Sequence, residues 1–199
     1  MRHPQTIGNL NNEFVGQRNS PLSEQGEIQC KEAVDALIAW KPKCIVSSPL
    51  ERCLSIAKPV ADKLSLEVLV DEDFIEMSFG AAEGLTFDEA IAQGYEYPWN
   101  HEADYVPIAG ADSLQDVINR CSCAFNEYAK IEEGRTAIIC HGGVIKAILS
   151  YVLNLQPAYT FRLLTNNVSS CIIQVHNGTP FIESLFLTPA DLKIHSKQN

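Results

Sequence analysis

The sequence lacks any apolar run close to the ~18 residues that a transmembrane helix needs. Its first residues, MRHPQTIGN, also lack the apolar core of a signal peptide. We therefore expect no membrane partner and a cytoplasmic location.

Basic residues are scarce as well. Lys and Arg together number 15 against 25 Asp and Glu, which gives a formal net charge of −10 at pH 7. Because the phosphate backbone of nucleic acids demands a basic surface, this balance argues against a nucleic-acid partner. It leaves room for a small phosphorylated substrate, since a few local arginines can dominate the potential of one pocket.

Paired metal-ligand motifs are also missing. The seven cysteines contain no CxxC pair, and Cys121-Ser-Cys123 with five dispersed histidines is a poor zinc pattern. We therefore expect neither a metal nor a cofactor. The cysteines are interpreted as reduced thiols, several of them used as small core residues.

What is present is a regular alternation of strand-like and helical patterns. With 199 residues, 46% of them hydrophobic and 20% charged, the chain fits one globular domain over 1–199. Strand-like runs at 43–48 and 136–143 follow amphipathic helical patterns at 22–40 and 113–131. This alternation predicts an α/β fold with three αβα layers around a mostly parallel central sheet.

Three local signals refine this prediction. Ser48 before Pro49, with Glu51 three residues after the serine, predicts a helix capped by Ser48, which puts Arg52 in its first turn. Thr86, followed three residues later by a glutamate, predicts a second helix start. Asn177-Gly178 between two alternating runs predicts a β-hairpin.

Polar residues follow both strands where a ligand is expected, because open α/β sheets bind ligands beyond the carboxyl ends of their strands. Arg52 follows the first strand, and His141 with Gly142 follows the second. Helix N-termini and the arginine fork both favour an anion. If Arg2-His3 lies at a third such point, two arginines and two histidines meet in a cluster that needs an anion. Taken singly, each is more often a solvated or hydrogen-bonded loop residue, or part of a disordered end.

Together these stretches resemble the histidine phosphatase superfamily, the phosphoglycerate mutase-like group. RHPQTIGN is similar to the family's Arg-His-Gly signature, SSPLERC to its second-arginine motif and CHGGVIKAIL to its second-histidine motif. DFIEMSFGAAEGLT resembles its E-x-x-F-G-x-x-E-G stretch, and GADSL its G-E-S stretch. The resemblance covers nearly the whole chain. Among family members, the chain looks most like bacterial phosphatases described as α-ribazole phosphatase or as phosphoglycerate mutase-like.

The resemblance implies a phosphatase that hydrolyses a small-molecule phosphomonoester through a phosphohistidine intermediate. His3 would be the nucleophile, and Glu76 would be the general acid and base. Arg2, Arg52 and His141 would hold the phosphoryl oxygens. The implied substrate-binding residues are Asn9, Gly16 and Gly142.

A mutase that transfers the phosphoryl group within phosphoglycerate is the alternative reaction. It must hold a substrate with two anionic ends, yet no Lys or Arg occurs between Lys63 and Arg120. That span includes Glu76 and a predicted lid at 77–112. Its carboxylates would repel a second anionic group, so hydrolysis is favoured.

The predicted lid also carries aromatic residues and a further acid. Tyr95, Tyr97, Trp99 and Tyr105 form either a wall for an organic leaving group or the packing of the lid onto the body. Glu83 is interpreted as structural.

Two departures from the family pattern affect the start of the chain. Pro4 stands where the family has Gly, which restricts His3 and removes a backbone donor. Only Met1 precedes the Arg-His pair where the family has an apolar strand, so the first strand is either upstream, missing or truncated. Without that strand, His3 would lie on a frayed end. The chain would then be a catalytically weak member that only binds phosphorylated ligands.

Overall fold

A parallel three-stranded sheet lies at the centre of the fold, as the alternating pattern predicts. The computed structural model describes residues 1–98, 101–131 and 134–197. The strand order is β2-β1-β3, with β1 at Cys44–Ser47, β2 at Val68–Val70 and β3 at Thr136–Ile139. Ile45 of β1 pairs with Val68 on one side and with Ala137 on the other.

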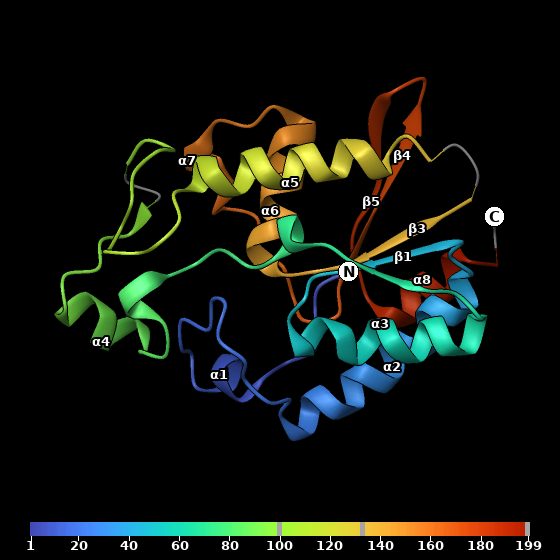
Figure 1. Cartoon of the computed structure of the whole chain (residues 1–199), viewed down its shortest axis with the longest axis horizontal. Helices are drawn as coiled ribbons and strands as arrows, with labels where there is room; N and C mark the ends of the chain where they lie inside the picture. The colour runs from blue at the N-terminus through green and yellow to red at the C-terminus, as the bar shows by residue number, and fades with distance from the viewer. Residues whose placement is uncertain (99–100, 132–133, 198–199) are drawn as a thin grey trace.

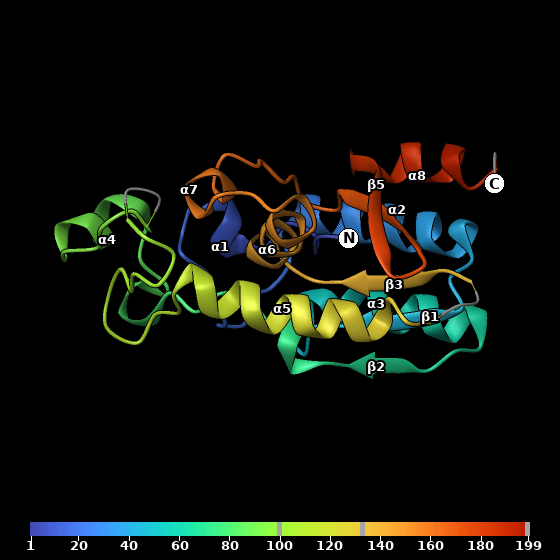
Figure 2. The same ribbon diagram turned by 90° about the horizontal axis from the view of Figure 1, so that it is seen from above.

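Helices cover both faces of this sheet (Figures 1 and 2). One face packs against α2 (Glu24–Trp40), α3 (Glu51–Leu64) and α8 (Pro189–His195), and the other against α5 (Leu114–Tyr128) and α6 (Gly142–Leu153). Neighbouring strand residues point to opposite faces. Accordingly, Ile45 lies in the first core cluster and Val46 in the second. The three-layer αβα architecture is therefore confirmed.

The predicted starts of two helices have different outcomes. Thr86 caps α4 in a reciprocal capping box with Glu89, as its pattern predicts. By contrast α3 begins at Glu51 with Leu50 as its N-cap residue, so the prediction that Ser48 caps this helix is wrong. Arg52 still lies in the first turn of α3. The remaining short helices are α1 (Ile7–Leu10), η1 (Glu72–Phe74), η2 (Gly80–Ala82), α4 (Phe87–Ala92) and α7 (Pro157–Thr160).

The predicted hairpin is present as β4 (Ser170–His176) and β5 (Thr179–Leu187). Its two turn residues, Asn177 and Gly178, have φ values of 51° and 76°. Asn and Gly are the residues that tolerate this left-handed geometry best, which is why the dipeptide indicated the turn.

The first residues of the chain pair with the backbone at the end of β3, close to the carboxyl ends of β1 and β3 (Figure 1). Arg2 forms a parallel bridge with Cys140, and the backbone N–H of His3 donates to the Cys140 carbonyl over 3.0 Å. The Arg2 N–H donates to the Ser169 carbonyl, so this piece links β3 to the start of the hairpin. The predicted frayed end is wrong, because His3 is only 3% exposed.

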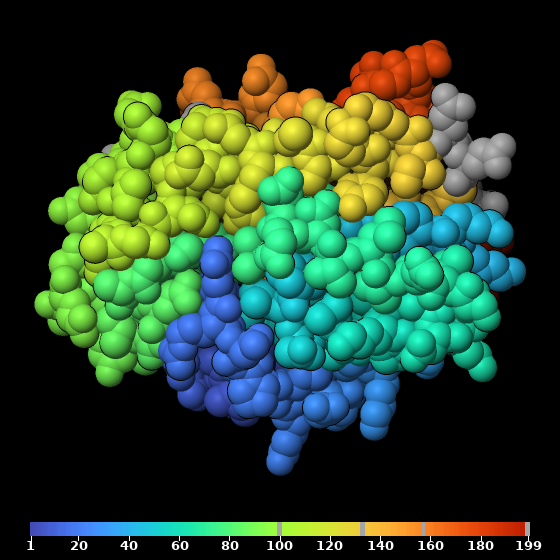
Figure 3. Space-filling view, viewed as in Figure 1, coloured from blue at the N-terminus to red at the C-terminus, as the bar shows by residue number. Residues whose placement is uncertain are grey.

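The segment 77–112 extends to one end of the molecule, where α4 lies (Figures 1 and 3). A separate small core of Phe14, Ala82, Ala90 and Tyr95 joins it to the loop that follows α1. Across residues 1–98, 101–131 and 134–197, every helix is too short or too polar to cross a membrane.

Candidate active site

The two histidines singled out in the sequence lie side by side in the interior. The centroids of the His3 and His141 rings are 5.2 Å apart, and both side chains are buried. His3 is fixed by the backbone bridge to β3, and His141 is the N-cap residue of α6, directly after the same strand. The carboxyl end of β3 therefore positions both rings.

One backbone contact orients the His3 ring. Its Nδ1 lies 2.7 Å from the Pro4 carbonyl oxygen. A carbonyl can only accept, so Nδ1 carries the proton and Nε2 keeps a free lone pair. Burial, then the positive charges of Arg52 and Arg2, lower the pKa of His3 well below its ordinary value. The ring is therefore a neutral imidazole at pH 7.

Arg52 donates three hydrogen bonds, one to His141 and two to backbone carbonyls. Its Nε donates to His141 Nδ1 over 3.3 Å, and its terminal nitrogens donate to the carbonyls of Gly16 and Arg18. His141 Nδ1 is thus an acceptor, so the ring proton lies on Nε2, which is 2.7 Å from Ser48 Oγ. Burial, followed by the charge of Arg52, lowers the pKa of His141 well below its ordinary value.

Arg2 adds a second largely buried cation. One terminal nitrogen donates to the Thr165 carbonyl over 2.5 Å, while its buried Nε has no hydrogen-bond partner. Burial lowers the pKa of Arg2, Glu76 opposes that shift, and Arg52 adds to it. Two buried cations with an unsatisfied N–H are costly unless an anion lies between them.

Glu76 lies beside the N-terminus of α6. Its carboxylate oxygens accept from the backbone N–H groups of Met77, over 2.9 Å, and Gly143, over 3.3 Å. A Cβ at Gly143 would come within 2.4 Å of a Glu76 carboxylate oxygen, so this approach requires glycine. A Cβ at Gly142 would lie 3.1 Å from the Thr165 hydroxyl, a tight but less severe contact.

Asn9 lies within the network behind His3. It closes the capping box of α1 by accepting from the Thr6 N–H. Asn167 donates its amide both to Asn9 Oδ1 and to the His3 carbonyl. The structure thus brings Asn9 next to the backbone of His3, and its side-chain carbonyl oxygen supports that loop.

Gly16 supplies a backbone carbonyl to Arg52 from a left-handed conformation with φ of 53°. A Cβ there would collide with the Glu83 side chain. Glu83 in turn accepts from the backbone N–H groups of Gln17 and Phe79, over 3.0 and 3.1 Å. These contacts fit the interpretation of Glu83 as a structural acid that ties the Gly16 loop to the segment after Glu76.

Sequence reasoning missed several supporting residues. Ser48 was interpreted as a helix cap, but its hydroxyl meets His141 instead. Arg120 and Gln17 both donate to the Glu76 carbonyl, and the loop of Thr165 and Asn167 supports Arg2 and His3. The one available signal was Arg120, which ends the span without basic residues.

The aromatic residues of the 77–112 segment favour packing over a ligand wall. Tyr95 is 4% exposed and lies against Phe14, with ring centroids 4.7 Å apart. Tyr105 stacks on His101. Trp99 lies outside the described residues.

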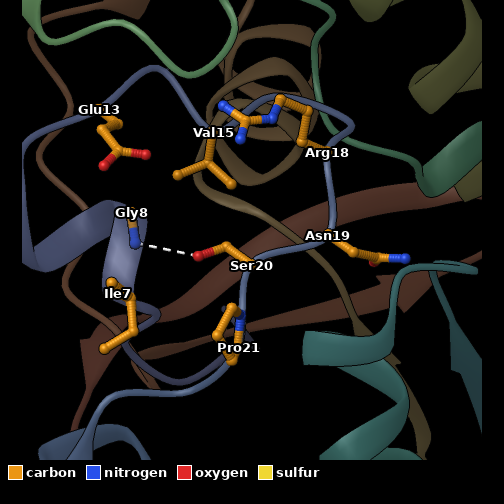
Figure 4. A pocket seen from close by; sticks show the side chains of 8 residues that line it. All are labelled: Ile7, Gly8, Glu13, Val15, Arg18, Asn19, Ser20 and Pro21. Carbon is orange, nitrogen blue, oxygen red and sulfur yellow. Dashed lines mark hydrogen bonds between the residues drawn. The ribbon is translucent and has the colours of Figure 1, made fainter.

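A pocket of about 200 Å³ lies against the same loop that supports Arg52. Figure 4 shows Glu13 and Arg18 at one end of it and Ile7 and Pro21 at the other. The two histidines, Arg52 and Glu76 do not line it, so it is not the space between the buried cations.

The arrangement suits the transfer of a phosphoryl group. A neutral imidazole, one buried and one partly buried guanidinium group and a carboxylate lie near helix N-termini, which is what positioning and charge stabilisation of a phosphoryl group require. Among the described residues, no three His, Cys, Asp or Glu side chains are placed to hold a metal ion.

Comparisons with known proteins agree with this geometry. The family model for the histidine phosphatase superfamily (branch 1) matches residues 1–188. A bifunctional protein of Mycobacterium tuberculosis is 32% identical over 180 residues, or 88% of this chain and 49% of its own length. The chain therefore spans about half of that relative. Glucosyl-3-phosphoglycerate phosphatase of Mycobacterium tuberculosis is 31% identical over 169 residues, or 79% of this chain and 75% of its own length.

Solved structures share the fold over nearly the whole chain. A mycobacterial glucosyl-3-phosphoglycerate phosphatase in complex with VO3 matches with a TM-score of 0.81 and 29% identity, over 92% of this chain and 95% of that one. The α-ribazole phosphatase of Shigella flexneri matches with a TM-score of 0.83 over 94% and 95% of the two chains. Its 17% identity extends the likeness to the fold alone.

Proposed function

The chain belongs to the histidine phosphatase superfamily, and from that premise we propose that it hydrolyses a small-molecule phosphomonoester through a phosphohistidine on His3. The phosphatase relatives support the hydrolytic reaction in general terms. The observation that carries the finer proposal is the convergence of the free His3 Nε2 with two largely buried arginines, one of which has an unsatisfied N–H.

In the first step His3 Nε2 attacks phosphorus, and the bond between phosphorus and the ester oxygen breaks. Arg2 and Arg52 offset the charge on the phosphoryl oxygens, while the helix N-terminus that follows His141 adds partial positive charge. Glu76, in its protonated form, gives its proton to the leaving oxygen. The products are an alcohol and a phosphoryl group bonded to His3.

In the second step a water molecule attacks the phosphohistidine. The Glu76 carboxylate takes a proton from the water, the bond between nitrogen and phosphorus breaks, and inorganic phosphate leaves. The lone pair returns to His3 Nε2. The proton stays on Nδ1 throughout, where it is donated in the hydrogen bond to the Pro4 carbonyl. Water is the one further reactant, and no oxidant or reductant is required.

Water is favoured as the acceptor of the phosphoryl group over a hydroxyl of phosphoglycerate, which is the acceptor in the mutase alternative. Arg120, the first basic residue after Lys63, is turned onto backbone carbonyls next to Glu76 and is not free for a second anion. Which monoester is hydrolysed stays a prediction. The family resemblance favours a nucleoside-like ester such as α-ribazole phosphate, and the names of the relatives favour a phosphorylated sugar acid.

The experiment is hydrolysis of p-nitrophenyl phosphate in the presence of EDTA. We expect metal-independent turnover by the wild type and a loss of more than ~10³-fold in His3→Ala, because the nucleophile is removed. His176 is exposed at the end of β4, so His176→Ala is the matched control and should retain full activity. Full activity of His3→Ala would contradict the nucleophile assignment. Turnover of phosphoglycerate by mutase transfer at a rate comparable to hydrolysis would contradict the choice of water as acceptor.

A further inference from the structure

Arg120 projects from α5 toward the chain segment that carries Glu76. One of its terminal nitrogens donates to the carbonyls of Asp73 and Ile75, over 2.7 Å each. The other donates to the carbonyl of Glu76 itself over 3.2 Å. A single guanidinium group thus binds three carbonyls in the four residues that end at Glu76.

We propose that Arg120 is a positioning residue that sets the place of the Glu76 carboxyl group, a role that rests on the proposed function of Glu76 as the acid and base. Arg120 acts through the backbone and does not touch the phosphoryl site. Its side chain is 20% exposed, and its hydrogen bonds and its ion pair with Asp112 lie on the Glu76 segment and its immediate neighbours.

Two further contacts complete the hold on this segment. Gln17 donates its side-chain amide to the Glu76 carbonyl over 3.0 Å, from the loop that also supports Arg52. Asp112 accepts from the Ser78 N–H over 2.8 Å, and one of its oxygens lies 3.7 Å from an Arg120 terminal nitrogen. The backbone is therefore held at the Glu76 carbonyl by Gln17 and Arg120, and just after it at Ser78 by Asp112. Arg120 contacts both the Glu76 carbonyl and Asp112.

Only a guanidinium group can make this set of contacts. Its N–H groups lie in one plane and point in fixed directions, so it can serve several carbonyls at once, whereas a lysine ammonium group is a compact charge on a flexible stem. Carbonyl oxygens of consecutive residues point in different directions along an irregular segment. Removing the guanidinium group frees the backbone turn that aims the carboxyl group.

A displaced acid has a specific kinetic signature. A good leaving group such as p-nitrophenolate departs without a proton, whereas an alkoxide must be protonated as it leaves. Loss of positioning therefore slows alkyl phosphates far more than aryl phosphates. A loss of general stability lowers both rates by the same factor, because it reduces the amount of active protein.

The experiment compares p-nitrophenyl phosphate with an alkyl phosphate such as glycerol phosphate. For Arg120→Met we expect kcat/KM, which covers only the steps up to departure of the leaving group and so excludes hydrolysis of the phosphohistidine, to fall about 30-fold on the alkyl ester and less than about 3-fold on the aryl ester. Arg135→Met is the matched control, because Arg135 also donates to a backbone carbonyl, that of Trp40, away from the site. It should leave both rates at the wild-type level.

A double mutant links the effect to Glu76. Glu76→Gln removes the acid, so adding Arg120→Met to it should cause no further loss on the alkyl ester, because the two changes remove the same contribution. Arg120→Lys keeps the charge but not the fork and should fall between wild type and Arg120→Met. If Arg120→Met folds poorly, as judged by its melting temperature, Arg120→Lys replaces it in the comparison of the two esters.

The outcomes separate this inference from the proposed function. Equal losses of kcat/KM on both esters, or additive losses in the double mutant, overturn the positioning role while the phosphatase assignment stands. Equal losses are the result expected if Arg120 instead bound the phosphoryl group that both esters share. If the wild type and the Arg135→Met control hydrolyse neither ester, it is the proposed function that fails.

Discussion

At the scale of single residues, the least expected contact is that of Ser48 with His141. Both side chains are fully buried, and the Ser48 hydroxyl accepts the Nε2 proton while Arg52 donates to Nδ1. The ring is thus held at both nitrogens, in the opposite tautomer to His3. Its orientation toward the buried cations depends on a hydroxyl that lies between β1 and α3.

We expect Ser48→Ala to lower both stability and turnover. The change leaves the His141 N–H buried without its acceptor, which costs about 1–3 kcal/mol of unfolding free energy. A loosened ring also lowers kcat by about 10-fold. Urea unfolding and the rate on p-nitrophenyl phosphate measure the two effects.

Ser150→Ala is the control for this prediction. Ser150 pairs with the Thr160 hydroxyl over 2.7 Å, and both side chains are buried, so the variant also strands a buried hydroxyl. It should lose stability without losing kcat. If both variants lower kcat to the same extent, the role of Ser48 is packing and not orientation of His141.

The side chains of the candidate site could be predicted from the sequence where each belongs to a short local motif. His3, Arg52 and His141 each belong to a local motif at a strand end, and the topology brings those ends together. Ser48 and Arg120 could not be assigned in this way. Their partners are 93 and 44–47 residues away, and the direction of a side chain depends on tertiary packing that no local pattern encodes.

At the scale of elements, patterns located whole helices better than their ends. The amphipathic runs at 22–40 and 113–131 became α2 and α5 within a few residues. The start of α3 was misplaced because the only backbone N–H from which the Ser48 hydroxyl accepts is that of Leu50, the residue before the helix, over 3.4 Å, and its shorter contact is with the distant His141. The frayed end was also wrong, because Met1 to His3 find backbone partners in β3 and before β4.

Gly80 joins the two ends of the 77–112 segment. It lies next to the bridge between Phe79 and Ala111, with φ of 51°, and a Cβ there would come within 2.5 Å of backbone atoms of Ala109 and Ala111. Gly80→Ala must therefore push the bridge apart. We expect faster amide hydrogen exchange across 77–112, measured by mass spectrometry, and a lower kcat.

Gly94 offers a matched comparison within the same segment. It also has a positive φ, of 94°, but a Cβ there meets nothing within 4 Å. Gly94→Ala adds only the backbone strain of about 1–2 kcal/mol. Hydrogen exchange at the bridge should then stay close to wild type. Equal effects of the two substitutions would show that the close backbone approach at Gly80 is unimportant.

At the scale of the whole molecule, the fold buries His3, His141 and Arg52 in the interior, where the first residues of the chain meet the three layers. Burial is the largest cause that lowers the pKa of both His3 and His141, and Arg52 is the next in each case. Glu76, the nearby acid, accepts from backbone N–H groups beside them. The native state therefore disfavours protonated histidine far more than the unfolded chain does.

This difference makes stability depend on pH with a definite sign. The folded-state pKa of each histidine lies below the ordinary value of 6.5 that applies in the unfolded chain. Below that pH the unfolded chain binds protons that the native state excludes, so the free energy of unfolding falls as pH falls. Above it both states hold neutral histidine and stability is level. The most sensitive window lies between 6.5 and the ordinary glutamate value of 4.5, and its upper part precedes most carboxylate titration.

We expect the free energy of unfolding, measured with urea at several pH values, to fall between pH 6.5 and 4.5 with a slope that approaches about 1.4 kcal/mol per pH unit for each of the two histidines. His3→Gln removes one of these groups and should halve the slope. His176 is exposed at the end of β4. His176→Gln should therefore leave unchanged the part of the slope that comes from His3 and His141. A stability that stays level across this window would mean that the buried rings accept protons as readily as the unfolded chain. In that case burial, together with the charges of Arg52 and Arg2, does not impose the neutral, nucleophilic form of His3 on which the proposed reaction depends.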